Sequence, residues 1–200
     1  MVSALPSPQP LFRPAAERFH SSLDWLDSWH SFSFAGHHHP DWMGYGPLRV
    51  INDDTIAAGR GFGMHPHRDM EIITVMVEGE LTHTDSMGHN AVLRAGEVQR
   101  MSAGTGIVHS EINQSPDPCR LLQIWIEPVR RGLVPDYAQA HFSDAERRGR
   151  LRLVASAEGR DGSLTLNQDA NLFIGRLGDG ERISHAPAAG RRLWLQLALG

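Results

Sequence analysis

Short runs of apolar and β-branched residues, separated by turn residues, dominate the central part of the chain. The runs are residues 72–77, 81–84, 91–93, 98–101 and 121–126. Gly79 and Gly96 each stand with acidic neighbours between two runs, which is typical of hairpin turns. Little of this pattern repeats at helical spacing. Several short strands so close together predict an all-β fold, either a barrel or a sandwich.

The second half of the chain has a weaker pattern of the same kind. Its predicted strands are residues 151–154, 164–166, 172–177 and 193–199. One short helix is predicted within residues 137–148, with Ser143 and Asp144 as its cap positions. We therefore expect an N-terminal β domain over residues 1–135, a linker with a short helix over 136–150, and a C-terminal β domain over 151–200.

Composition narrows the class of protein. The 200 residues are 40% hydrophobic and carry a net charge of −4, without a run of Lys or Arg, which disfavours direct binding to nucleic acid or to a membrane surface. Cys119 is the single cysteine, so no intramolecular disulfide forms and a reducing compartment is expected. Residues 1–14 hold four prolines and no basic region followed by an apolar run. These features predict a cytoplasmic protein.

Two short segments carry the candidate chemistry. His65 and His67 alternate in one, and His109 and Glu111 alternate in the other. Alternate residues of a strand point to the same face, so two such strands side by side form a metal cage. Three imidazoles and one carboxylate suit Fe, Ni, Cu, Mn or Zn, and such a set leaves coordination positions open for water or substrate.

The remaining histidines are weaker candidates. Residues 37–39 are consecutive histidines and cannot all face one ion, so we expect a solvated loop there. His83 and His89 lie in or beside a hairpin and are expected to be exposed. His185 has no second histidine two residues away, so the second β domain is expected to be metal-free.

The glycines and histidines around these segments resemble those of the pirin family of the cupin superfamily. The resemblance is carried by GFGMHPHRDME at 61–71, DSMG at 85–88, MSAGTGI at 101–107 and HSE at 109–111, within a match that runs from about Phe19 to Pro128. It implies two tandem cupin barrels, which are double-stranded β-helices of the jelly-roll type. A complete second cupin would extend beyond Gly200, so we expect a truncated chain or an incomplete second barrel with an open edge.

The resemblance also implies a metal, most often iron, held by His65, His67, His109 and Glu111. Many cupins instead use the glutamate that matches Glu71, which has the strand parity of His65 and His67. We favour Glu111, because its spacing from His109 repeats the spacing of the first pair. Glu71 is then expected to support a ligand from outside the coordination sphere or to be a charge at the edge of the core.

Three functions follow from the resemblance. Several bacterial pirin-like proteins cleave the flavonol quercetin with dioxygen and release carbon monoxide, with Glu111 here as the expected general base. The partners would then be a flavonol and O2, and Phe62, Met64 and Trp125 are candidates for the pocket lining or for the core. The alternatives are a metal-dependent regulatory protein that binds a protein partner, as animal pirin does, and a storage or structural bicupin with a closed metal site.

Overall fold

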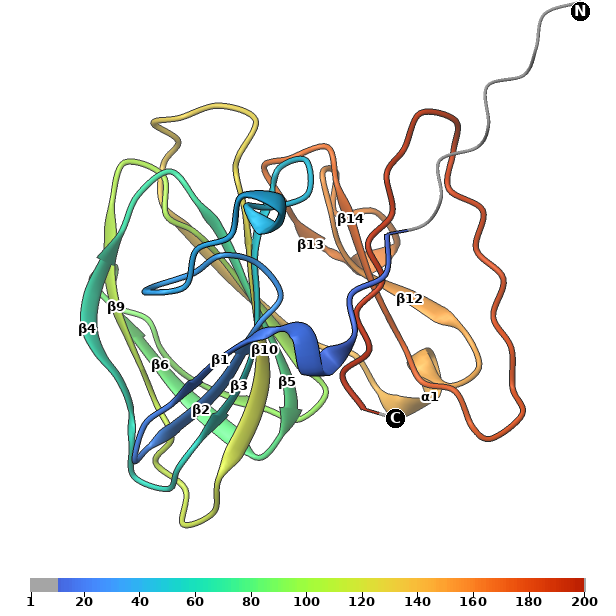
Figure 1. Cartoon of the computed structure of the whole chain (residues 1–200). Helices are drawn as coiled ribbons and strands as arrows, with labels where there is room; N and C mark the ends of the chain where they lie inside the picture. The colour runs from blue at the N-terminus through green and yellow to red at the C-terminus, as the bar shows by residue number, and fades with distance from the viewer. Residues whose placement is uncertain (1–10, 200) are drawn as a thin grey trace, which may run out of the picture.

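Two antiparallel sheets form the larger part of the computed structural model, which describes residues 11–199. The larger sheet has, in spatial order, β1 (Phe19–Ser22), β2 (Leu26–His30), β3 (Leu48–Ile56), β10 (Cys119–Ile126), β5 (Glu71–Glu78), β8 (Glu97–Ser102) and β11 (Asp136–His141). The smaller sheet has β4 (Gly61–His67), β9 (Ile107–Ile112), β6 (Glu80–Asp85) and β7 (Asn90–Arg94). In Figure 1, β4 and β9 curve around the left side of the molecule, across from β3, β10 and β5. The all-β prediction is confirmed.

A third, three-stranded sheet belongs to the second half of the chain. It consists of β13 (Leu164–Thr165), β12 (Leu151–Ser156) and β14 (Asn171–Gly175). The described helices are α1 (Asp144–Arg147) and short 3-10 turns at Ala15–Glu17, Pro40–Trp42 and Arg160–Gly162. None of the helices in residues 11–199 is long and apolar enough to cross a membrane. The N-terminal residues up to 10, on which part of the compartment prediction depends, lie outside this range.

The space between the two larger sheets is apolar at one end and polar further along. Leu26, Ile56, Met76, Leu81 and Leu121 are among the buried residues of the apolar end. Next to it, five successive strands of the larger sheet contribute one paired row of polar residues, namely His30, Asn52, Gln123, Thr74 and Gln99. Paired residues share a face of the sheet, so this row forms a polar floor opposite the smaller sheet.

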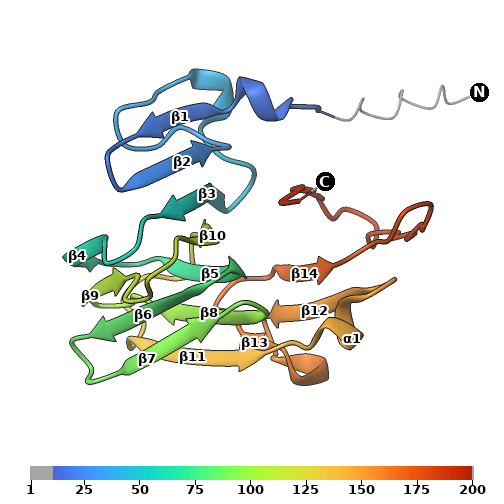
Figure 2. The same ribbon diagram turned by 90° about the horizontal axis from the view of Figure 1, so that it is seen from below.

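The opposite face of the larger sheet packs against the second half of the chain. One buried apolar cluster combines Ile73, Val98 and Ile124 of that sheet with Val154 and Leu166 of the second half. Figure 2 shows β12, β13 and β14 beside the larger sheet, past β5, β8 and β11. The two halves therefore share a core.

Two predictions in the second half are wrong in detail. Residues 136–141 of the expected linker form β11, which pairs with β8, and only residues 144–147 are helical. The Ser143 cap is confirmed, because Ser143 and Glu146 form a capping box. The strand expected over residues 193–199 pairs with no strand within the described range. Its alternation has another cause, because Trp194 packs on Phe32 while Leu193, Leu195 and Leu197 are exposed.

Candidate metal centre

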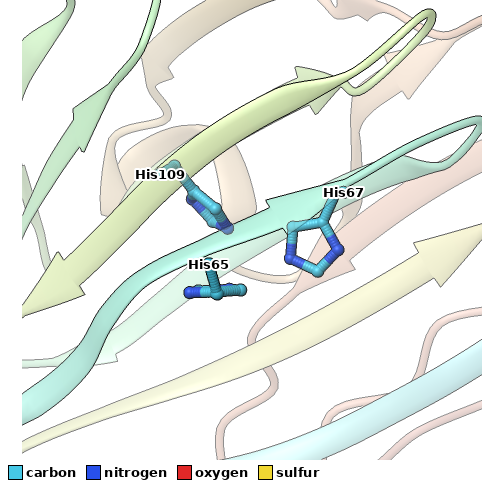
Figure 3. A group of neighbouring side chains, drawn as sticks. All are labelled: His65, His67 and His109. Carbon is cyan, nitrogen blue, oxygen red and sulfur yellow. The ribbon is translucent and has the colours of Figure 1, made fainter.

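The centre is built on two neighbouring strands of the smaller sheet. β4 and β9 are antiparallel, and His65 lies directly opposite His109. His67 is two residues further along β4 and shares the face of His65. Pro66 lacks a backbone N–H. It is tolerated between the two histidines because β4 is an edge strand, so no second neighbouring strand needs a hydrogen bond from that position. Figure 3 shows the three imidazoles turned toward one another.

The three histidines each offer a ring nitrogen, and these nitrogens all lie within 4.8 Å of one another. The ring centroids are 4.4 Å apart for His65 and His109, and 4.8 Å apart for His65 and His67. His109 is buried, whereas the other two are half-buried. His65 Nδ1 donates to the carbonyl of Gly63 at 2.7 Å, which leaves Nε2 with a free lone pair.

The electrostatics keep the imidazoles of His67 and His109 neutral. Burial and the neighbouring His65 lower the pKa of His67 to about 4. Burial, His65 and His67 lower the pKa of His109 to about 3. At neutral pH both rings therefore present lone pairs, as metal ligands must.

The buried nitrogens of His109 give an independent indication of a metal. Neither nitrogen has a hydrogen-bond partner among the described residues. Buried polar atoms are normally paired, so two free nitrogens on one fully buried ring require a partner. A borderline divalent metal fits this donor set.

Glu111 lies next to His109 in a second group. Glu111, His83 and His109 are all buried, and each offers one ligand-type atom within 4.8 Å of the others. Thr74 Oγ1 donates to the Glu111 carboxylate at 3.3 Å, and Gln123 Nε2 donates to it at 3.0 Å. Burial raises the pKa of Glu111, although these hydrogen bonds act in the opposite direction. Glu111 thus combines proximity to His109 with an increased proton affinity.

His83 was expected to be exposed, and this prediction is wrong. Its side chain is fully buried, because β6 pairs with β9 and places His83 directly opposite Glu111. His89 is half-buried and bonds to Asp85. The alternation of His83 and Asp85 was the available sequence signal, since it repeats the spacing of the two ligand pairs.

Glu71 lies elsewhere. β4 ends at His67 and β5 begins at Glu71 in the other sheet, so the strand parity linking them does not hold. The Glu71 carboxylate is buried and accepts from Ser102 Oγ at 2.9 Å and from the backbone N–H of Asn167 at 3.1 Å. It forms a contact between the two halves of the chain and belongs to neither ligand group.

The three residues expected to line a pocket or the core lie in different surroundings. The Trp125 ring lies 4.9 Å from the His67 ring, and its buried indole N–H has no partner in residues 11–199. The Phe62 ring lies 6.3 Å from the His65 ring and also packs on Trp25. Met64 is 60% exposed on the outer side of β4. Of the three, Trp125 is the best placed to touch a molecule bound beside His67.

Comparisons with known proteins find a matching family and similar proteins. Residues 12–126 match the Pirin family, and residues 153–200 match the quercetinase C-terminal cupin domain. The chain is 50% identical over 189 residues to the quercetin 2,3-dioxygenase of Escherichia coli K12, covering 94% of this chain and 80% of that protein. A putative quercetin 2,3-dioxygenase of Pseudomonas aeruginosa is 47% identical over 94% of this chain and 82% of its own length.

A solved structure provides the spatial comparison. The crystal structure of the bacterial pirin YhhW from Escherichia coli in complex with nickel(II) matches with a TM-score of 0.77 and 51% identity. The match covers 80% of this chain and 69% of that one.

Proposed function

This chain belongs to the pirin family, and on that premise we propose that it is a metal-dependent dioxygenase that cleaves a flavonol such as quercetin with dioxygen. The observation that carries the proposal is the group of three converging imidazoles with a buried carboxylate beside His109. This donor set occurs on a chain half identical to a quercetin 2,3-dioxygenase. A purely structural metal site would need no carboxylate of raised proton affinity at its inner side.

We infer that His65, His67, His109 and Glu111 hold the ion, and that iron(II) is the working metal. Imidazoles and a carboxylate with open positions are typical of non-haem iron, although Zn, Ni, Mn and Cu also accept such donors. When bound, the ion supplies a Lewis acid for the flavonol hydroxyl and a place for dioxygen.

The residues of the chain supply a general base, the groups that hold it in place and an aromatic surface for the substrate. Glu111 is the general base that takes the hydroxyl proton, because its buried carboxylate lies beside His109, next to the position of a flavonol bound to the ion. Gln123 and Thr74 hold its carboxylate oxygens in place. Trp125 beside His67 forms a flat aromatic wall, which suits the planar rings of a flavonol.

The test is reconstitution of the metal-stripped protein with Fe(II), Mn(II), Ni(II), Cu(II) or Zn(II) under anaerobic conditions. Quercetin and air are then added while substrate absorbance and oxygen uptake are recorded. We expect turnover with at least one metal and its loss in His109→Ala. Glu111→Gln should lower kcat about 10²- to 10⁴-fold.

The matched control is His38→Ala, since His38 is an exposed histidine of the loop before β3. It should leave turnover unchanged. If the folded, metal-loaded protein turns over no quercetin with any of the five metals, the dioxygenase proposal is wrong and a regulatory role takes its place.

A further inference from the structure

A buried His–Asp pair on β6 faces the inner side of the metal centre. In the ladder between β6 and β9, His83 lies opposite Glu111 and Asp85 lies opposite His109. Directly opposed residues of an antiparallel pair place their side chains on the same face. The imidazole of His83 is fully buried, and its ring centroid lies 5.3 Å from that of His109.

Hydrogen bonds define which nitrogen of His83 faces the centre. The Asp85 carboxylate lies 3.0 Å from His83 Nε2. It also accepts from the backbone N–H groups of Met87 and His89, and it lies 2.9 Å from His89 Nδ1. A carboxylate with so many donors is an acceptor, so His83 Nε2 carries the proton and Nδ1 holds a lone pair.

The lone pair on Nδ1 is buried and has no partner among the described residues. His83 lies within the group whose other members are His109 and Glu111. An imidazole that gives one nitrogen to a metal keeps an N–H on the other, and this N–H needs an acceptor to fix the ring. Neither ring nitrogen of His109 is hydrogen-bonded to His83 in this structure, but His83 Nδ1 is a free acceptor atom in the same group, and Asp85 holds the ring from its other side.

The ring of His83 is also fixed from the far side. Tyr137 of β11 packs against it with ring centroids 4.8 Å apart, and the same tyrosine stacks on His89 at 4.7 Å. The Tyr137 hydroxyl donates to Gln139, whose amide donates to the carbonyl of Val92. An imidazole held in one orientation in this way restricts the orientation of the side chains packed against it.

We propose that His83, held by Asp85, is a positioning residue of the metal centre that fixes His109 from inside the barrel. It acts through His109 and does not itself bind the ion. This inference rests on the metal centre proposed above. Removal of such a supporting group weakens metal binding about 10- to 100-fold in other proteins.

The test compares His83→Phe with His89→Phe in Cu(II) binding. Phenylalanine keeps a ring against Tyr137 and removes both nitrogens, and His89 is the matched control because it shares both Asp85 and Tyr137. Affinity is measured by competition with a chelator, and pulsed EPR counts the coordinated imidazoles. We expect His83→Phe to raise the Kd about 10- to 100-fold and to change the EPR parameters with the imidazole count unchanged. His89→Phe should stay within about twofold of wild type.

Two outcomes would overturn the inference. Unchanged affinity and spectrum in a folded His83→Phe would show that His83 has no influence on the ion. One coordinated imidazole fewer than wild type would make His83 a ligand. If His83→Phe fails to fold, Asp85→Asn replaces it, because it weakens the hold on His83 Nε2 and should give the same shifts. Failure of wild type to bind Cu(II) would instead refute the metal centre itself.

Discussion

Asp54 on β3 carries a carboxylate inside the barrel, where Ser28 Oγ donates to it. Burial raises the pKa of Asp54 to about 7, helped by the charges of Glu111 and Asp53 and opposed by the Ser28 hydrogen bond. Between pH 3.8, the ordinary value, and about 7, the folded state keeps a proton that the unfolded state has lost. The free energy of unfolding therefore falls as pH rises through this window, by about 4 kcal/mol in total.

Asp54→Asn should remove this dependence. The amide keeps an acceptor for Ser28 and cannot ionise, so the variant should be more stable than wild type at pH 8 and should change less between pH 4 and pH 8. Denaturant unfolding over that pH range measures both effects. The neighbouring Asp53→Asn is the control and should be destabilised at pH 8, because Asp53 accepts two hydrogen bonds from Arg120. An Asp54→Asn protein less stable than wild type at pH 8 would refute the argument.

The sequence predicts which candidate ligands share a face only where their relation is local. His65 and His67 are two positions apart, and their shared face follows from strand geometry alone. The burial of His83 depends on which strand lies beside β6, and this is set by a pairing with β9 across more than 20 residues. Local spacing contains no information on that register, so the sequence alone predicts an exposed hairpin residue at His83.

Gly61 of β4 lies directly against the backbone of β9. A Cβ built there would lie 2.2 Å from the Glu111 carbonyl oxygen and 2.7 Å from Ile112 Cα. Both contacts are with backbone, so Gly61→Ala must move one strand away from the other. Because His65 and His109 sit on these two strands, we expect a loss of about 1–3 kcal/mol in stability and a weaker metal affinity.

Gly63→Ala is the matched control on the same strand. A Cβ there meets nothing within 4 Å, so thermal unfolding and Co(II) titration should both stay close to wild type. Equal metal affinity in the two variants would mean that the spacing of β4 and β9 does not govern the site.

Elements with compact apolar runs and clear turns are predictable from the sequence, and β5, β6, β7, β8 and β10 all form where expected. The segments predicted wrongly are those whose alternation comes from contacts with parts of the chain that are distant in sequence. Residues 136–141 alternate because Tyr137 faces the barrel while Ala138 and Ala140 pack on the second half. Residues 193–199 alternate because one side lies on the larger sheet, although no strand offers them backbone partners in residues 11–199.

The contact between the two halves depends in part on Glu71. Its carboxylate accepts from Ser102 and Asn167. In Glu71→Gln the side-chain NH2 would face one of these donors, so the free energy of unfolding should fall by about 1–3 kcal/mol. Cu(II) affinity should remain within about twofold, because Glu71 lies outside both ligand groups. Glu111→Gln, the matched substitution, should weaken metal binding. The reverse result, with Glu71→Gln losing the metal, would restore Glu71 as the ligand.

The shared apolar cluster predicts that the whole molecule unfolds as one unit. Leu166 is 1% exposed and packs in the cluster that also contains Ile73 and Val98 of the larger sheet. Leu166→Ala should cost about 2–5 kcal/mol. It should shift the unfolding midpoint recorded by far-ultraviolet circular dichroism and the midpoint recorded by Co(II) absorption of the metal centre by the same amount. Leu195→Ala, at a residue that is 76% exposed, should shift neither. Separate transitions, with the Co(II) signal surviving the first, would show that the metal-binding half is stable without the contacts of the second half.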